Sequence, residues 1–228
     1  MKFTDFESLI SSPRCFRYVA ACANDTKKAM TLYRANLRLS QEIFSVLAIF
    51  EIVLRNKIDQ HYRNIFHPII GNNEWLLHAS NPGGYLTTHG CQKSLQSVQT
   101  ALQDLYTRSG YTHDKLVAEL MFGFWRFQFA AKEFMAAGSS LHHIFPNRPA
   151  GTNHTDVFKK LGFINKIRNR IAHHEPICFG PANTISTVYA FNHYSAILEL
   201  FQWMGIDAKD LLYGIDKVQK EVGFINSL

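Results

Sequence analysis

The stretch SQEIFSVLAIFEIVLRNKI, residues 40–58, decides the fold of this chain. Its large apolar side chains recur at spacings of three or four residues, at Ile43, Leu47, Phe50, Leu54 and Ile58. Such spacing puts them on one face of an α-helix. The stretch therefore predicts one long helix over about residues 24–66. We expect the helix to end at His67-Pro68, because a residue before proline is disfavoured in the helical conformation.

Helical periodicity continues along the chain, and the alternating pattern of β-strands is nearly absent. A loop rich in Gly, Asn and Pro is expected over residues 71–84. Further helices are predicted over 88–106, 112–137, 155–174 and 183–204, with a short amphipathic tail over 207–224. The run AELMFGFWRFQF, residues 118–129, is apolar on nearly every side, so its aromatic residues are expected in the core. We expect an all-α fold with a single domain over residues 1–228.

Basic residues outnumber acidic ones, 24 Lys and Arg against 18 Asp and Glu, which gives a formal charge of +6. This excess suits a polyanionic partner, either nucleic acid or an anionic membrane surface. Hydrophobic residues make up 46% of the chain, which is enough to bury a core and argues against wholesale disorder.

The four cysteines are scattered and form no CxxC pair. We therefore expect neither a zinc site nor a disulfide framework, and we predict a cytoplasmic protein. No run reaches the ~18 apolar residues of a membrane span, so no membrane partner is expected. Acidic residues near the N-terminus do not suit a signal peptide.

The segment KIRNRIAHHEP, residues 166–176, resembles the motif segment of a family of ribonucleases that cleave RNA without a metal. That reaction removes a proton from the 2′-hydroxyl, neutralises the phosphate and protonates the leaving 5′-oxygen. Histidine changes protonation near neutral pH, and the planar guanidinium of arginine matches two phosphate oxygens. In this scheme Arg168 holds the phosphate, His173 handles the proton and Asn169 donates a positioning hydrogen bond. Five residues turn a helix by about 140°, so Arg168 and His173 do not share one face.

Four segments, in order, resemble a known family. Arg168-Asn169-x-x-x-His173 is similar to the Rx4-6H motif of HEPN ribonucleases, and RNRIAHHEP resembles the Abi-like (abortive infection) branch of that superfamily. The stretch from YRAN at 33–36 to FEIVLRN at 50–56 resembles the family's early helix. LVAELMFGFW at 116–125 resembles its central helix, and Phe145-Pro146 its aromatic-proline step. The resemblance covers roughly residues 30–180.

The resemblance implies a HEPN-like helical bundle with additional helices. It also implies a metal-independent endoribonuclease that leaves a 2′,3′-cyclic phosphate and acts as a toxin in abortive phage defence. HEPN relatives commonly form dimers in which the motif helices face each other. We therefore expect a homodimer with a composite site, RNA as the partner and no cofactor.

Three residues of the long helix are candidates for a supporting role. Glu51 and Arg55 are four residues apart and suit a local ion pair, and we expect Glu51 to orient Arg168. Asn56 follows Arg55 in the segment that resembles the family's early helix. Arg55-Asn56-x-x-x-x-His61 also matches the Rx4-6H pattern, so it is an alternative site.

Paired histidines invite a metal interpretation, at His142-His143 and at His173-His174. Adjacent residues of a helix point about 100° apart and rarely bind one ion together, so we expect no metal. His174 is then expected to support the site by packing or by contact with RNA. Lys166 and Arg170 lie nearest the motif and are expected to bind RNA.

Two other functions stay open at this stage. One is a non-catalytic HEPN protein in which Arg168 and His173 grip phosphate without cutting it. The other is a protein-interaction module that an antitoxin or another regulatory protein neutralises. RNA binding that weakens steeply with salt separates the RNA-active hypotheses from the interaction module.

Overall fold

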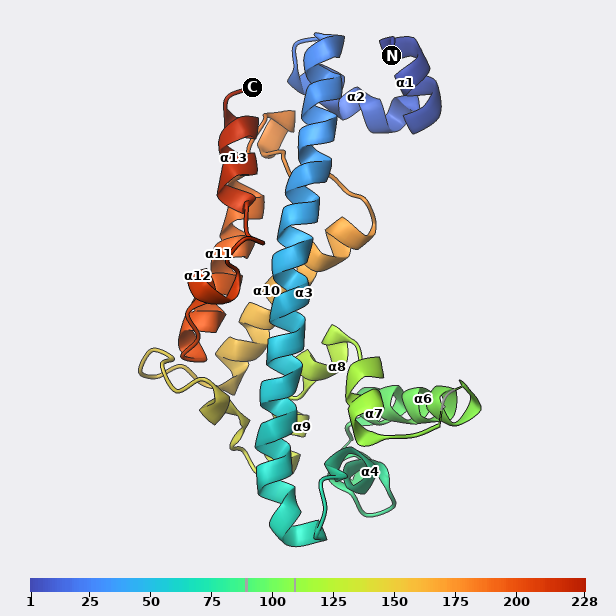
Figure 1. Ribbon diagram of the computed structural model, residues 1–228, viewed down its shortest axis with the longest axis vertical. Helices are drawn as coiled ribbons and strands as arrows, with labels where there is room; N and C mark the ends of the chain where they lie inside the picture. The colour runs from blue at the N-terminus through green and yellow to red at the C-terminus, as the bar shows by residue number, and fades with distance from the viewer. Residues whose placement is uncertain (89, 109) are drawn as a thin grey trace. The chain divides into compact units, whose positions relative to one another are not determined.

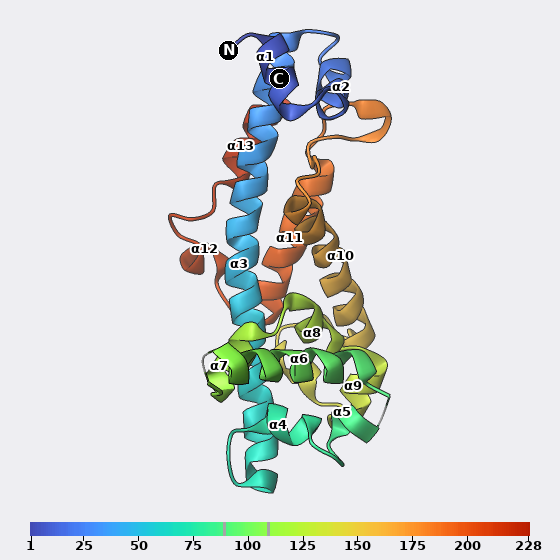
Figure 2. The same cartoon turned by 90° about the vertical axis from the view of Figure 1, so that its right-hand side faces the viewer.

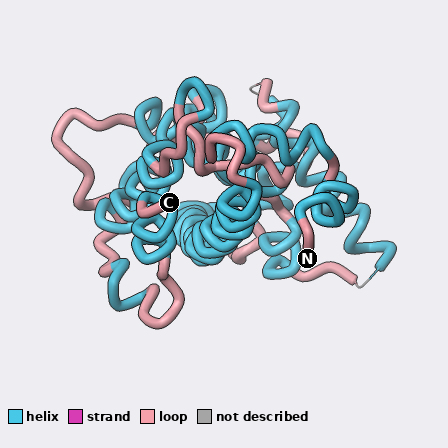
Figure 3. Tube along the Cα trace, turned by 90° about the horizontal axis from the view of Figure 1, so that it is seen from above, coloured by secondary structure: helices cyan, strands magenta, loops and turns pink. Residues whose placement is uncertain are grey.

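A computed structural model describes the chain from residue 1 to 228, except residues 89 and 109. Figure 3 shows helices joined by loops, and none of the described residues forms a β-strand. One isolated antiparallel bridge pairs Phe179 with Ile185. The predicted all-α fold is confirmed.

The chain divides into two compact units. Unit 1 comprises Met1–Ala48, Lys166–Glu199 and Asp207–Leu228, and unit 2 comprises Ile49–Asn165 and Leu200–Ile206. Three helices contribute a segment to each unit, namely α3 (Thr26–Ile70), α10 (His154–Ala172) and α11 (Val188–Trp203) (Figure 1). Because both units are assembled from separated segments, the expectation of one domain over residues 1–228 stays a prediction.

The long helix predicted from the apolar stripe is α3, which has 45 residues. All five stripe residues are at most 1% exposed, as the spacing predicts. The predicted end at His67-Pro68 is wrong, because α3 includes Pro68 and continues to Ile70. Pro68 lies two residues before the end of α3, so the helix loses only the one hydrogen bond that the missing N–H of this proline would donate. The helix stops instead at Gly71, whose φ of +72° suits a residue without a side chain.

The rest of unit 1 consists of helices near the two ends of the chain. The first residues, for which the sequence analysis predicted no helix, form α1 (Phe3–Ile10) and α2 (Ser12–Ala21). Figures 1 and 2 place both beside the start of α3. Phe6, Cys15 and Met30 join α1, α2 and α3 in one buried cluster. The predicted tail forms α12 (Ala208–Leu211) and α13 (Val218–Asn226).

Unit 2 is a set of shorter helices around the second half of α3. They are α4 (Trp75–Ser80), α5 (Tyr85–Thr88), α6 (Gln92–Arg108), α7 (His113–Glu119), α8 (Phe122–Phe127), α9 (Ala131–Ala136) and the 3-10 helix η1 (Leu141–Ile144). Figures 1 and 2 show α6 running across the direction of α3. The helix α4 lies where the sequence analysis predicted only a loop. The helix predicted over 88–106 begins later, at Gln92, and residue 89 lies outside the described residues.

The single helix predicted over residues 112–137 is wrong, because the chain forms α7, α8 and α9 there. Leu120 and Met121 adopt extended backbone conformations, with ψ values of 126° and 163°, and separate α7 from α8. Ala130, with ψ of 149°, separates α8 from α9. An apolar run is compatible with a long buried helix and with several short ones, so periodicity does not locate these breaks.

Four of the five aromatic residues of the run 118–129 are core residues, as expected, whereas Phe127 is half-buried. Phe122, Phe124, Trp125 and Phe129 are all less than 5% exposed.

The remaining predicted helices match closely, with α10 ending at Ala172 and α11 starting later than predicted, at Val188. Among the described residues, no helix has both the length and the apolar character needed to cross a membrane.

Asp59 holds α3, α4 and α7 together inside unit 2. Its carboxylate accepts hydrogen bonds from Trp75 Nε1 at 2.8 Å and His113 Nε2 at 2.7 Å. The other carboxylate oxygen lies 2.7 Å from Arg63 Nε. Burial acts to raise the pKa of Asp59, but the hydrogen bonds from His113 and Trp75 and the charge of Arg63 outweigh it and lower that pKa. The carboxylate is therefore stabilised in its charged form.

We predict that Asp59→Asn lowers the free energy of unfolding by about 1–3 kcal/mol near neutral pH. Asp59 has a lower pKa in the folded chain than in the unfolded chain, where the pKa is about 3.9. The charged carboxylate therefore stabilises the fold above about pH 3.9, and this stabilisation is lost as the pH falls through the lower pKa of the folded chain. The difference between wild type and Asp59→Asn should therefore shrink below about pH 4, as measured by urea unfolding. Asp114→Asn, which removes an exposed partner of Arg63, is the control and should cost less than about 1 kcal/mol. A pH-independent difference would contradict this role of Asp59.

Candidate functional site

The candidate site lies at the C-terminal end of α10, within unit 1. Glu175 N–H donates to the Arg170 carbonyl at 2.8 Å, and His174 N–H donates to the Ile171 carbonyl at 3.0 Å. These two bonds form a Schellman motif, the arrangement that closes many helices. The motif stops α10 and turns the chain sharply after His173.

His174 occupies the position of this motif that glycine usually fills. Its φ is +56°, in the left-handed region that costs an L-residue roughly 1–2 kcal/mol. Both His173 and His174 are exposed. A strained position that keeps a chemically useful, exposed side chain is a candidate for function.

A buried hydrogen bond fixes the segment that follows the two histidines. The side-chain oxygen of Asn36, which is 3% exposed, accepts from the backbone N–H of Ile177 at 2.8 Å. Asn36 lies on α3 in the YRAN segment noted in the sequence. This bond ties the end of the motif segment to α3 inside unit 1.

His173 and His174 line a cavity of about 340 Å³ together with residues of α2 and α3. Its other lining residues are Pro13, Arg14, Arg17, Tyr18, Tyr33, Glu175 and Pro176. The cavity thus combines two imidazoles, two guanidinium groups and two phenol rings. We call it the His–Arg pocket.

The two arginines of this pocket come from one face of α2, because they are three residues apart. Arg14 is exposed, and its Nη1 donates to the His174 carbonyl at 3.2 Å. Arg17 Nε donates to Asn183 Oδ1 at 2.8 Å, and its guanidinium lies 4.5 Å from the centre of the Phe179 ring. A guanidinium has five N–H donors, so further donors of both arginines remain for a ligand in the pocket.

The aromatic wall of the pocket is packed firmly. The ring of Tyr18 lies 5.0 Å from that of Tyr33 and 4.9 Å from that of Phe179. Burial raises the pKa of Tyr18, so this phenol stays neutral. Tyr33 also packs edge-on against Phe6 at 5.3 Å. These contacts fix α2, and with it the two arginines, against the start of α3.

The structure does not place every predicted catalytic residue in this pocket. Arg168 is half-buried on α10 and is absent from the described residues that line the pocket. Asn169 is exposed, and its carbonyl accepts from His173 N–H at 2.9 Å. The pocket therefore brings His173 together with Arg14 and Arg17 and not with Arg168, its expected partner.

The two expected RNA-binding residues differ in their surroundings. Lys166 is exposed. Arg170 Nε lies 3.1 Å from Glu175, and its guanidinium lies 4.8 Å from the centre of the Tyr189 ring. This ion pair partly neutralises the charge of Arg170. It also partly neutralises the carboxylate of Glu175, which lines the His–Arg pocket. RNA contact by Lys166 and Arg170 stays a prediction.

Glu51, Arg55 and Asn56 belong to unit 2, whereas Arg168 belongs to unit 1. The expected role of Glu51 in orienting Arg168 stays a prediction. His61 of the alternative motif lies 3.0 Å from the Ser140 hydroxyl, and burial lowers the pKa of His61. A lowered pKa keeps this imidazole neutral near pH 7, and its half-buried position makes it the weaker candidate for phosphate chemistry.

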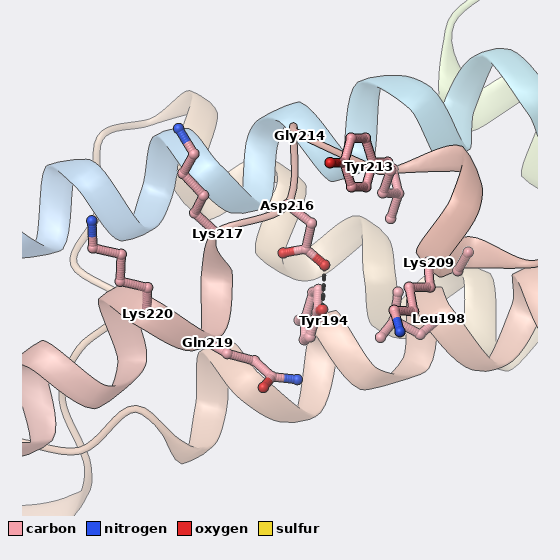
Figure 4. Close-up of a pocket in the computed structure, with 11 residues that line it drawn as sticks. Tyr194, Leu198, Lys209, Tyr213, Gly214, Asp216, Lys217, Gln219 and Lys220 are labelled. Carbon is pink, nitrogen blue, oxygen red and sulfur yellow. Dashed lines mark hydrogen bonds between the residues drawn. The ribbon is translucent and has the colours of Figure 1, made fainter.

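A second cavity in unit 1, of about 560 Å³, lies between α11, α12 and α13. Figure 4 shows the Tyr194 hydroxyl donating to Asp216, and this carboxylate and burial both raise the pKa of Tyr194. Lys217 and Lys220 point away from that hydrogen bond, and Lys209 extends on the opposite side (Figure 4). Because the ammonium groups do not converge, this cavity is not an anion site comparable to the His–Arg pocket.

Among the described residues, no group of three His, Cys, Asp or Glu side chains is placed to hold a metal ion. The four cysteines, Cys15, Cys22, Cys91 and Cys178, are buried free thiols. Burial raises the pKa of Cys91 to about 11 and that of Cys178 to about 12, so these thiols are poor nucleophiles.

Sequence reasoning missed Arg14 and Arg17. The available signal was Ser12-Pro13, a typical helix start, followed by two arginines on one helical face. Nothing in that pattern indicates that α2 packs beside residues 173–176, about 160 positions later in the chain.

Compared with models of known families, with curated proteins and with solved structures, the chain matches none. The resemblance to HEPN ribonucleases therefore rests on the quoted motifs alone.

We predict that His174→Gly raises the free energy of unfolding by about 0.5–1 kcal/mol, because glycine adopts a positive φ without strain. His174→Ala is the matched control, since it removes the same imidazole but keeps the strained backbone. Chemical denaturation of the three proteins measures the difference. A glycine variant less stable than the alanine variant would contradict the assignment of strain to this position.

Proposed function

We propose that the protein binds RNA in the His–Arg pocket and cleaves it without a metal. The observation that carries this proposal is the convergence of His173, His174, Arg14 and Arg17 on one cavity. Arginine guanidiniums neutralise phosphate, and two imidazoles supply the base and the acid that transesterification requires.

In the proposed reaction His173 removes the proton from the ribose 2′-hydroxyl. The 2′-oxygen then forms a bond to phosphorus while the bond from phosphorus to the 5′-oxygen breaks. His174 gives a proton to that leaving oxygen. The products are a 2′,3′-cyclic phosphate and a free 5′-hydroxyl, so atoms and charges balance without a cofactor.

Arg14 and Arg17 hold the phosphate in this scheme and stabilise the charge that develops on it. Arg168, which lies outside the pocket, and Asn169 act on the same phosphate from a second copy of the chain. This homodimer follows from the resemblance to HEPN ribonucleases, as do a toxic role in phage defence and control by an antitoxin.

A second candidate function is RNA binding without cleavage. It is favoured by the position of Arg168, since a single copy of the chain does not bring this arginine into the pocket with His173. Binding alone needs the cations of the pocket but not the proton transfers.

The decisive test is the cleavage of total cellular RNA in excess EDTA, with analysis of the 3′ ends. We predict cyclic-phosphate ends from wild type and a loss of about 100-fold or more in rate for His173→Ala and for His174→Ala. Arg14→Gln should lower the rate to a similar degree because it removes charge stabilisation. Lys209→Ala removes an exposed cation outside the pocket and is the control, with a rate within about twofold of wild type.

The outcomes separate the candidates. Undiminished cleavage by the His173→Ala and His174→Ala variants would move the site elsewhere, with Arg55 and His61 tested next. Absence of cleavage by every form, with salt-dependent RNA binding that Arg14→Gln weakens, would leave the non-catalytic function. Absence of both would favour a protein-interaction module.

A further inference from the structure

A second, more apolar groove adjoins the His–Arg pocket. It measures about 370 Å³ and is lined by Phe3, Glu7, Ser12, Pro13, Phe16 and Val19 of α1 and α2. Pro13 lines both cavities, so they meet at the start of α2. We call this second cavity the α1–α2 groove.

The helices that form the groove are held rigidly. A single residue, Ser11, separates α1 from α2, and its N–H donates to the Glu7 carbonyl at 2.8 Å. Beneath the groove, the buried cluster of Phe6, Cys15 and Met30 anchors both helices to α3. The groove is therefore a preformed surface of unit 1.

The surface of α2 carries aromatic and cationic side chains on different sides. Phe16 is 69% exposed and lines the groove, while Arg14 and Arg17 of the same helix line the His–Arg pocket, and Pro13 lies between the two cavities. An exposed aromatic ring in a groove that adjoins a cationic pocket is an arrangement with which proteins hold unpaired nucleotides, since the ring stacks on a base and the cations bind the backbone.

We propose that the α1–α2 groove is a nucleobase subsite for single-stranded RNA. This inference rests on the proposed function and specifies its substrate. The base stacks on Phe16 in the groove, the strand passes Pro13, and a neighbouring phosphate lies on Arg14 and Arg17 in the His–Arg pocket. A duplex does not fit this arrangement, because its bases are stacked within the helix and cannot enter a side groove.

The groove also favours particular bases. Glu7 is the carboxylate among the described residues that line it, and a carboxylate accepts hydrogen bonds but donates none. Every base has an N–H group that can donate to Glu7, either an exocyclic amino group or, in uracil, the ring N–H. The preference comes instead from stacking, because the two fused rings of adenine cover more of Phe16 than the single ring of uracil.

The test is fluorescence anisotropy with short labelled 2′-O-methyl oligonucleotides, which cannot undergo 2′-hydroxyl attack. The full-length protein should bind single-stranded oligoadenylate about tenfold more tightly than the matching duplex, and more tightly than oligouridylate. Phe16→Ser should raise the Kd for oligoadenylate about tenfold, because one stacking contact is lost. Leu9→Ser removes an apolar side chain that is 73% exposed and lies outside the groove, and its Kd should stay within about twofold of wild type.

An unchanged Kd for Phe16→Ser, or equal binding of duplex and single strand, would overturn the subsite. If cleavage depends on His173 but Phe16→Ser binds oligoadenylate with an unchanged Kd, the proposed ribonuclease function is kept and the subsite is rejected. Conversely, the expected binding results without any cleavage would support the subsite and remove the ribonuclease proposal. Binding to anionic phosphatidylserine vesicles that Phe16→Ser abolishes, with no RNA binding, would make the groove a membrane-contact surface and overturn the inference.

Discussion

The 2.8 Å hydrogen bond from the Ile177 N–H to the buried side chain of Asn36 determines where the candidate site stands. The chain leaves α10 after His173, turns at His174 and returns to α3 at Ile177. This bond and the burial of Ile177, Cys178 and Phe179 fix the path of the short exposed turn that precedes them. Asn36 and Tyr33 belong to the YRAN segment, and in the structure the first ties down the motif segment while the second lines its pocket.

The end of α10 shows a conflict between stability and chemistry. A glycine at position 174 would relieve the strained backbone, yet it would take away one of the two imidazoles in the pocket. Arg14 donates to the carbonyl of that same residue, which links α2 to the turn. The strained backbone of His174 thus occurs at the residue whose carbonyl contacts Arg14 and whose imidazole lines the pocket proposed to bind phosphate.

Local patterns in the sequence predicted the parts of the fold that depend on short-range order. The apolar stripe of α3 and the boundaries of α10 follow from helical period and from breakers. The breaks between α7, α8 and α9 were not predictable, since an apolar run leaves the chain several buried paths. For the site, His173 and His174 were identified from their motif, but Arg14 and Arg17 reach the pocket only through tertiary packing of α2.

If RNA binds in the His–Arg pocket, His173 and His174 face one of its phosphates. Nuclear magnetic resonance of the histidine side chains, with signals assigned by single substitutions, tests it during titration with a single-stranded 2′-O-methyl oligonucleotide. The signals of His173 and His174 should move together and saturate, and Arg14→Gln should weaken this response. If the oligonucleotide binds and shifts the signals of other histidines while those of His173 and His174 stay unchanged, RNA does not bind in the His–Arg pocket.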